Sequence, residues 1–234
     1  MRDRQRALAK LTLSFRVTGV RGDGYHLVEA EMVTVDLADN LIFGPGDGVE
    51  VVGAPGLGGG EENLVRRALG AVGRKAGVRL EKRIPVGGGL GGGSADAAAV
   101  LRWANCVDAR VAVGLGADVP FCLVGGRARV SGIGETVDVL PFQERTFTLL
   151  PYSRPVSTVA VYGAWDELGG PAADGPNDLE PAALTVAPQL AAWRDRLGDA
   201  TGLTPTLAGS GGTWFVEGAF PEVKGAIVTR TARP

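Results

Sequence analysis

The chain has 234 residues, of which 45% are hydrophobic and 21% are charged, a composition typical of a globular protein with one large or two small domains. Glycine is over-represented at 37 residues, and because it follows no repeating period it indicates a loop-rich fold rather than a fibrous one. The net charge of −2, without a long basic block, argues against nucleic acid or an anionic membrane as a partner.

The N-terminal part of the sequence predicts strands joined by glycine-rich turns. Residues 1–11 carry charge but no apolar core of signal-peptide length, and no apolar run is long enough to cross a membrane, so we expect a cytoplasmic protein. Alternating apolar residues predict a strand over 9–17, a turn over 18–26 and one or two strands over 27–43. Another short strand is predicted over 48–55.

A helix and a strand are predicted before the most unusual stretch of the chain. Residues 62–77 have helical spacing, because their apolar residues share one stripe: Leu64, Ala68, Leu69 and Val72. Residues 78–86, "VRLEKRIPV", predict a strand whose charges exclude burial on both faces.

The stretch from Ile84 to Val100, "IPVGGGLGGGSADAAAV", has six glycines in a seven-residue window. Glycine loses more entropy on folding than any other residue, so such a cluster requires a reason. The segment 94–107 predicts a helix with Ser94 as its N-cap. A glycine loop that runs into a helix N-terminus exposes a row of N–H groups and partial positive charge, which suits a phosphate.

Two common phosphate motifs do not fit this loop. A Walker A loop needs a lysine before its serine or threonine, and here Gly93 precedes Ser94. Gly87, Gly89 and Gly92 satisfy G-x-G-x-x-G, but a dinucleotide fold requires an apolar first strand, and "LEKRIPV" is charged. The alternative interpretation of these glycines is a mobile surface loop that binds no ligand.

Beyond the alanine-rich helix, residues 119–140 predict a strand, a turn and a strand. The two cysteines, Cys106 and Cys122, stand in apolar contexts and are expected to be buried free thiols.

The pattern of predicted strands and helices changes at about residue 141. A strand, a turn and a short helix are predicted over 146–168, mostly helix over 177–200, and a strand, a tight glycine turn and a strand over 205–218. We expect two α+β lobes, 1–143 and 144–234.

Several motifs together resemble the GHMP kinase superfamily. "IPVGGGLGGGSADAA" is similar to its second signature, and "AKLTL" with "RGDGYH" is similar to its first. The same order continues through "ENLVRRA", "LGADVPFCLVGG", "GIGE", "PVSTVAVY", "NDLE" and "AGSGG", the last similar to the third signature. The resemblance spans roughly residues 9–217, and its specificity comes from the order of the motifs rather than from any one of them.

The resemblance implies an α+β, two-lobed GHMP kinase fold. Its N-terminal lobe would bind ATP and resemble ribosomal S5 domain 2, its C-terminal lobe would be an α/β-sandwich that binds the substrate, and the active site would lie in the cleft between them. Within the superfamily, the motifs are most similar to those of kinases that phosphorylate the 2-hydroxyl of a cytidyl-diphosphate methylerythritol in isoprenoid precursor synthesis. ATP and Mg²⁺ are implied, and the protein would be a monomer or homodimer without nucleic-acid or membrane partners.

The resemblance also implies roles for individual residues. Lys10 and Asp118 match the catalytic pair, in which the carboxylate orients or deprotonates the alcohol and the ammonium stabilises charge. Ser94 also matches a residue near Mg²⁺. The expected ATP-binding residues are Asn63, Pro85, Gly87, Gly88, Gly89, Leu90, Gly91, Gly92, Gly93, Ser94 and Ala95.

The expected substrate site is assigned in the same way. Tyr25 and Tyr162 would stack on cytosine, His26 would hydrogen-bond the edge of the base, and Thr158 would lie near the substrate hydroxyls. The remaining expected contacts are Thr12, Asp118, Gly209, Ser210 and Gly211. The single histidine excludes a zinc cluster of histidines or a histidine-based triad.

The sequence also departs from the family pattern. Thr12 replaces an asparagine, the segment 105–116 is shortened, and Thr213 stands where alanine is more common. Two alternatives therefore stay open: another GHMP kinase of the homoserine or mevalonate type, and a divergent homologue that binds a nucleotide without catalysis.

Overall fold

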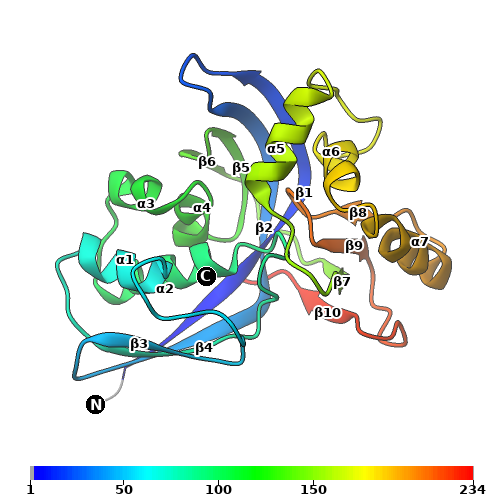
Figure 1. Ribbon diagram of the computed structural model, residues 1–234. Coiled ribbons are helices and arrows are strands. Elements are labelled where there is room, and N and C mark those ends of the chain that lie inside the picture. Colours follow the sequence, from blue (N-terminus) through cyan, green and yellow to red (C-terminus); the bar gives the residue numbers. More distant parts are fainter. Residues whose placement is uncertain (1–2, 234) are drawn as a thin grey trace.

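The computed structural model describes residues 3–233 and has two sheets with helices packed on them (Figure 1). We call the part built on the six-stranded sheet the N-terminal lobe. Its strands are β1 (Asp3–Val20), β2 (His26–Gly44), β3 (Gly48–Val52), β4 (Gly77–Glu81), β5 (Arg127–Gly132) and β6 (Thr136–Val139). Its helices are α1 (Leu64–Ala71), α2 (Gly92–Trp103), α3 (Ala109–Leu115) and α4 (Val119–Val124).

The central element of this lobe is the long β1–β2 hairpin. β2 pairs with β1 along nearly its whole length, with β5 over 28–33 and with β4 over 40–44. The strand predicted over 9–17 is therefore longer than expected, since β1 begins at Asp3 and ends at Val20. Irregularities in the β1–β2 register bend the hairpin.

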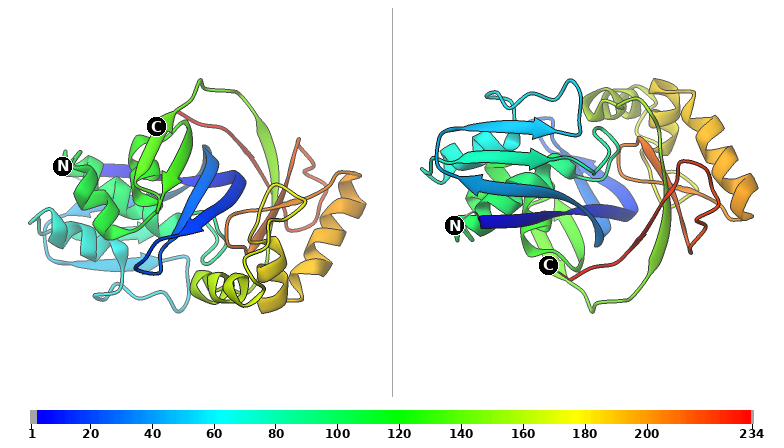
Figure 2. Two further views of the ribbon diagram at one scale, coloured as in Figure 1. Left: turned by 90° about the horizontal axis from the view of Figure 1, so that it is seen from above. Right: turned by 90° about the horizontal axis from the view of Figure 1, so that it is seen from below.

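The alanine-rich helix α2 is buried on almost every side. Its residues 95–101 are all buried, and it packs against β1, α1 and α4. Alanine fits this position because it loses no side-chain entropy and lets the neighbouring backbones approach closely. Figure 2 shows the four helices of the lobe gathered on one face of the sheet.

The structure corrects three expectations for this lobe. The N-cap of α2 is Gly91, in the left-handed conformation, so Ser94 lies inside the first turn and is not the cap. The strand predicted over 78–86 ends at Glu81. The segment 119–140 begins with helix α4, which was not predicted and which tolerates Pro120 in its first turn, where no N–H partner is needed. The predicted strand, turn and strand come after it, as β5 and β6.

The C-terminal lobe has a four-stranded sheet in the order β10-β7-β9-β8. Trp214, Phe147 and Leu149 are fully buried and form the centre of its core. Its strands are β7 (Thr146–Pro151), β8 (Thr206–Leu207), β9 (Thr213–Glu217) and β10 (Ile227–Arg230). Its helices are α5 (Thr158–Glu167), α6 (Glu180–Val186) and α7 (Leu190–Thr201).

Both cysteines are free thiols, as predicted, and Cys122 is buried, but Cys106 is only half-buried where burial was expected. Within residues 3–233, no helix combines the length and the apolar character that a membrane crossing requires.

Asp178 ties the two lobes together from a buried position. Its carboxylate accepts hydrogen bonds from Arg16 Nη1 at 2.6 Å and from the amides of Val17 and Ala173, both at 3.0 Å. Beside it, Phe15 of β1 forms an isolated bridge with Asn177. The contact fixes the β1–β2 hairpin against the segment before α6.

Replacing Asp178 should therefore loosen the contact between the lobes. Asp178→Ala leaves two amides and a guanidinium without their acceptor, and we expect the free energy of unfolding to fall by about 1–3 kcal/mol. Urea denaturation measures the change, with the exposed Asp195→Ala as the matched control. Equal losses for the two variants would contradict this role.

Candidate active site

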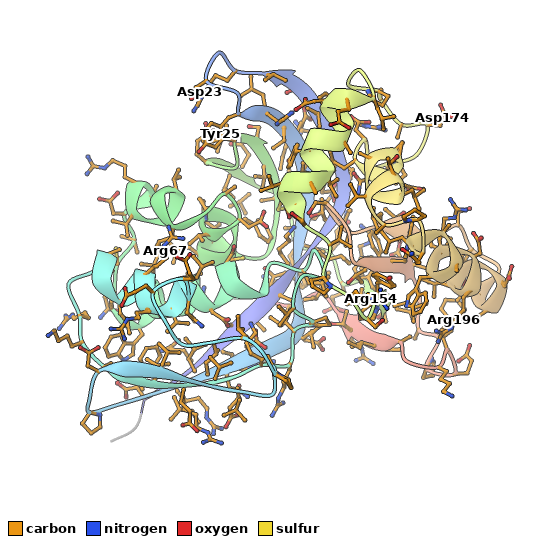
Figure 3. The ribbon with its side chains drawn as sticks, in the orientation of Figure 1. Asp23, Tyr25, Arg67, Arg154, Asp174 and Arg196 are labelled. Atoms are coloured by element: carbon orange, nitrogen blue, oxygen red, sulfur yellow. The ribbon has the colours of Figure 1, made fainter. Side chains whose placement is uncertain are left out.

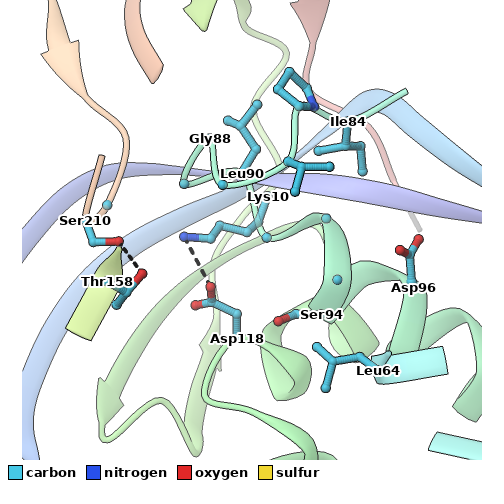
Figure 4. A pocket seen from close by; sticks show the side chains of 18 of the residues that line it. Lys10, Leu64, Ile84, Gly88, Leu90, Ser94, Asp96, Asp118, Thr158 and Ser210 are labelled. Carbon is cyan, nitrogen blue, oxygen red and sulfur yellow. Dashed lines mark hydrogen bonds and ion pairs between the residues drawn. The ribbon is translucent and has the colours of Figure 1, made fainter. Parts of the chain in front are cut away.

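A cavity of about 520 Å³ has the glycine loop as its principal wall. Lys10 and Asp118 line it from the N-terminal lobe, and Thr158, Tyr162 and Ser210 line it from the C-terminal lobe (Figure 4). The predicted ATP residues on its walls are Asn63, Pro85, Gly87, Gly88, Gly89, Leu90, Gly91, Gly92, Gly93 and Ser94. The structure thus brings most of the predicted site residues to one cleft.

The glycines of the loop are required first by neighbouring protein segments. A Cβ on Gly89, which has φ +74°, would overlap the carbonyl oxygen of Ala208 in the C-terminal lobe. A Cβ on Gly91 would lie 2.7 Å from Cγ of Lys10. The bare main chain therefore allows the loop to fit between the two lobes, a reason that the motif alone does not reveal.

The first turn of α2, which follows the glycine loop, lines the cavity. The Ser94 hydroxyl lies at this turn on the same side as Asp118 (Figure 4). By contrast, Ala95 is fully buried and its amide donates to the carbonyl of Gly91 at 2.8 Å, so it has no free group for a ligand. The N-terminal amides of Gly92, Gly93 and Ser94 remain the groups suited to an anion.

Lys10 and Asp118 form an ion pair at the foot of the loop. Lys10 Nζ lies 3.4 Å from Asp118 Oδ2 and donates a hydrogen bond to Thr12 Oγ1 at 3.0 Å. The Lys10 side chain is only 6% exposed, whereas Asp118 is 32% exposed and reaches the cavity. The amide of Lys10 also donates to the carbonyl of Leu90, which couples β1 to the loop. Thr12 is buried behind the pair and orients Lys10.

The opposite wall comes from α5 and the turn between β8 and β9. Thr158 Oγ1 and Ser210 Oγ lie 2.8 Å apart and share a hydrogen bond. Gly209 lines the cavity beside them, but Gly211 packs against the C-terminal core instead. Burial raises the pKa of the Tyr162 phenol, and Asp118 adds to the effect, so Tyr162 is a neutral donor at the cavity wall.

His26 is held by α5 rather than by the cavity. Its Nε2 lies 2.8 Å from Asp166 Oδ1, and its ring lies 4.6 Å from the Tyr162 ring and 5.5 Å from the Trp165 ring. Tyr25, by contrast, is 57% exposed at the tip of the β1–β2 hairpin (Figure 3), under the guanidinium of Arg21. The structure therefore pairs His26 with Tyr162 but leaves Tyr25 apart from them.

Asn63 has a structural role besides its place on the cavity wall. It caps α1, because its Oδ1 accepts from the amide of Val65 at 2.9 Å and its Nδ2 donates to the carbonyl of Gly58 at 2.9 Å. These bonds fix the edge of the cavity at the start of α1.

Sequence reasoning missed a buried cluster of charges beneath the loop, formed by Asp39, Lys82 and Asp96. Lys82 Nζ donates to both carboxylates, and its distance to Asp96 Oδ2 is 2.7 Å. Burial raises the pKa of Asp96 to about 7, with Lys82 opposing the shift and Asp39 adding to it. Burial disfavours charge on Lys82, but Asp96 and Asp39 outweigh it and raise its pKa. The only signal in the sequence was charge within "LEKRIPV".

The fold and the site define a class of protein. Residues 63–126 match the family described as GHMP kinases N terminal domain. The fold is shared with homoserine kinase from Cytophaga hutchinsonii, at a TM-score of 0.57 and 19% identity over 98% of this chain and 95% of that one. Mevalonate kinase from Methanococcus jannaschii aligns at a TM-score of 0.59 and 13% identity over 100% and 98%. The predicted GHMP kinase fold is confirmed.

Closer relatives narrow the class to one family. The chain is 39% identical to 4-diphosphocytidyl-2-C-methyl-D-erythritol kinase from Paracoccus denitrificans, over 91% of this chain and 85% of the relative. It is 38% identical to the kinase of the same name from Ruegeria pomeroyi, over 92% and 88%. A crystal structure of 4-(cytidine 5'-diphospho)-2C-methyl-D-erythritol kinase aligns at a TM-score of 0.76 and 30% identity over 99% and 100%. The chain belongs to the 4-diphosphocytidyl-2-C-methyl-D-erythritol kinase family.

A methyl group at Gly89 tests the fit of the loop between the lobes. Gly89→Ala would force both a left-handed backbone and an overlap with Ala208, so we expect a loss of about 1–3 kcal/mol in the free energy of unfolding. Gly93→Ala is the control, because a Cβ there meets only the flexible end of Leu64, at 3.2 Å. Urea denaturation compares the two variants. Equal free energies of unfolding would show that the contact between Gly89 and Ala208 does not restrict the loop.

The raised pKa of Asp96 predicts a specific pH dependence of stability. The folded chain keeps the Asp96 proton up to about pH 7, whereas the unfolded chain releases it near 3.8, so stability falls as pH rises through this window. Asp96→Asn removes this dependence. Urea denaturation at about pH 5 and about pH 8 should show the wild type losing stability relative to Asp96→Asn at the higher pH. A constant difference between the two proteins would refute it.

Proposed function

We propose that the protein transfers the γ-phosphoryl group of ATP to the 2-hydroxyl of 4-diphosphocytidyl-2-C-methyl-D-erythritol, a step toward isoprenoid precursors. The names of its relatives support this substrate. The observation that carries the proposal is the Lys10–Asp118 pair, set at 3.4 Å in the cavity that the glycine loop lines.

The pair has the groups that the transfer needs. Phosphoryl transfer depends mainly on positioning and charge stabilisation, with little covalent chemistry for the protein to perform. The Asp118 carboxylate accepts the proton of the substrate hydroxyl or aligns its oxygen for attack. The Lys10 ammonium offsets negative charge on the moving phosphoryl group. Thr12 supports the reaction by holding Lys10 rather than by touching the substrate.

The phosphates of ATP are assigned to the loop and to the first turn of α2. The free amides of Gly92, Gly93 and Ser94 and the partial positive charge of the helix favour anions there. No group of three or more His, Cys, Asp or Glu side chains suited to a metal occurs in residues 3–233. Mg²⁺ in kinases is usually bound through phosphates and one or two protein oxygens rather than by such a group. Ser94 and Asp118 would supply those oxygens, and Mg²⁺ would neutralise phosphate charge.

The cytidyl group is assigned to the end of the cleft formed by α5 and the β1–β2 hairpin. Tyr162 lines the cavity and its ring already lies against that of His26, which supports a base site at this point. Tyr25 follows the same hairpin turn, where it would cover the outer face of the base. Thr158 and Ser210 would contact the substrate hydroxyls.

Neither alternative function has comparable support. Homoserine and mevalonate kinases share the fold with this chain at only 19% and 13% identity. Identities this low do not support the inference that this chain acts on homoserine or mevalonate. A nucleotide-binding protein without catalysis would not need a buried lysine directed at a cavity carboxylate. A coupled ADP-release assay with the cytidyl alcohol, homoserine and mevalonate should give turnover with the cytidyl alcohol alone. Turnover with another alcohol, or none at all, would refute the proposal.

The catalytic pair is tested by substitutions that keep shape and remove charge. Asp118→Asn and Lys10→Met should each lower kcat about a hundredfold or more, because the proton acceptor or the stabilising cation is lost. Exposed Asp138→Asn and Lys75→Met are the matched controls and should turn over like the wild type. Near wild-type kcat in both cavity variants would remove these residues from the mechanism.

A further inference from the structure

The cluster of Asp39, Lys82 and Asp96 lies on the cavity side of the N-terminal lobe, and the catalytic roles proposed above do not use it. Lys82 and Asp96 both line the cavity, and all three residues are at least 92% buried. Three ionisable groups buried this deeply are costly unless they are paired with and hydrogen-bonded to one another. Their positions along the chain indicate what they serve.

Asp39 fixes the segment that enters the glycine loop. Its Oδ1 accepts hydrogen bonds from the amides of Arg83 and Ile84, the latter at 2.8 Å, immediately after β4 ends. Its Oδ2 accepts from Lys82 Nζ. Because Asp39 stands on β2, the central strand of the sheet, these bonds attach the entry of the loop to the most rigid part of the lobe.

Lys82 carries that attachment across to the segment that leaves the loop. Its ammonium donates to Asp96 Oδ2, 14 residues later in the chain, on α2. A Cβ placed on Gly92 would lie 3.2 Å from Lys82 Nζ, so the ammonium lies directly behind the first turn of the helix. Both ends of the loop therefore meet at one buried cation.

We propose that Lys82, held between Asp39 and Asp96, is a positioning residue for the nucleotide, which fixes both ends of the glycine loop and so sets the affinity for the ATP phosphates. Phosphate binding by backbone amides requires several N–H groups to converge on one point, and free loop motion would disperse them. The fixed ammonium behind Gly92 also adds positive charge at the helix N-terminus. The inference rests on the proposed use of ATP and is independent of which alcohol is phosphorylated.

The test measures ADP affinity by calorimetry in folded variants. Asp96→Leu removes the acceptor on α2 and should raise the Kd for ADP at least tenfold, whereas Asp96→Asn keeps an oxygen for Lys82 and should stay within about threefold. Because Lys82→Met alone would leave two buried carboxyls without their cation and could unfold the chain, it is combined with Asp39→Asn, and the pair should also raise the Kd at least tenfold. Lys75→Met is the exposed control.

Steady-state kinetics separates positioning from general loosening of the fold. The KM for ATP should rise in Asp96→Leu and in the Lys82→Met/Asp39→Asn pair, with the KM for the alcohol unchanged. Wild-type ADP affinity in both folded variants, or equal rises in both KM values, would overturn the inference. Normal ADP binding by the wild type without turnover of the cytidyl alcohol would overturn the proposed substrate and leave this inference standing.

Discussion

At three of its glycines, the main chain of the glycine loop lies so close to neighbouring residues that a side chain would not fit. Gly87 meets Pro155, Gly89 meets Ala208 and Gly91 meets Lys10, each closer than a Cβ would permit. The loop is therefore shaped by the protein around it before any nucleotide arrives. Such preorganisation would lower the entropy lost when a phosphate binds there, and it makes the shape of the proposed phosphate site depend on correct packing of both lobes.

The same loop positions the chemical groups below it. The carbonyl of Leu90 accepts from the amide of Lys10, and the Lys10 side chain runs beneath Gly91 to reach Asp118. The cation of the ion pair is thus nearly buried while its carboxylate faces the cavity, an arrangement suited to a group that stabilises charge beside one that meets the substrate. The close backbone packing of the loop thus also fixes the position of Lys10 relative to the cavity.

Local patterns predicted the parts of this structure that local physics controls. Alternation located the strands of the hairpin, helical spacing located α1, and the alanine-rich run after the glycines located α2. The cap of α2 was assigned to Ser94, because the sequence does not show that Gly91 adopts the left-handed conformation from which the helix begins. The apolar run at Val119–Val124 has no periodicity that separates helix from strand, which is why α4 was missed. The roles of Lys10 and Asp118 came from family resemblance. The bonds of Lys82 could not be predicted, since its partner Asp39 lies 43 residues away and only the folded sheet joins them.

In the proposed reaction, the glycine loop holds the phosphate tail of ATP above the Lys10–Asp118 pair. A crystal structure with a non-hydrolysable ATP analogue tests this most directly. We expect the γ-phosphate to lie against the amides at the start of α2, with the Lys10 ammonium within hydrogen-bonding distance. Phosphates bound elsewhere, or an empty loop beside a well-ordered nucleotide, would contradict it.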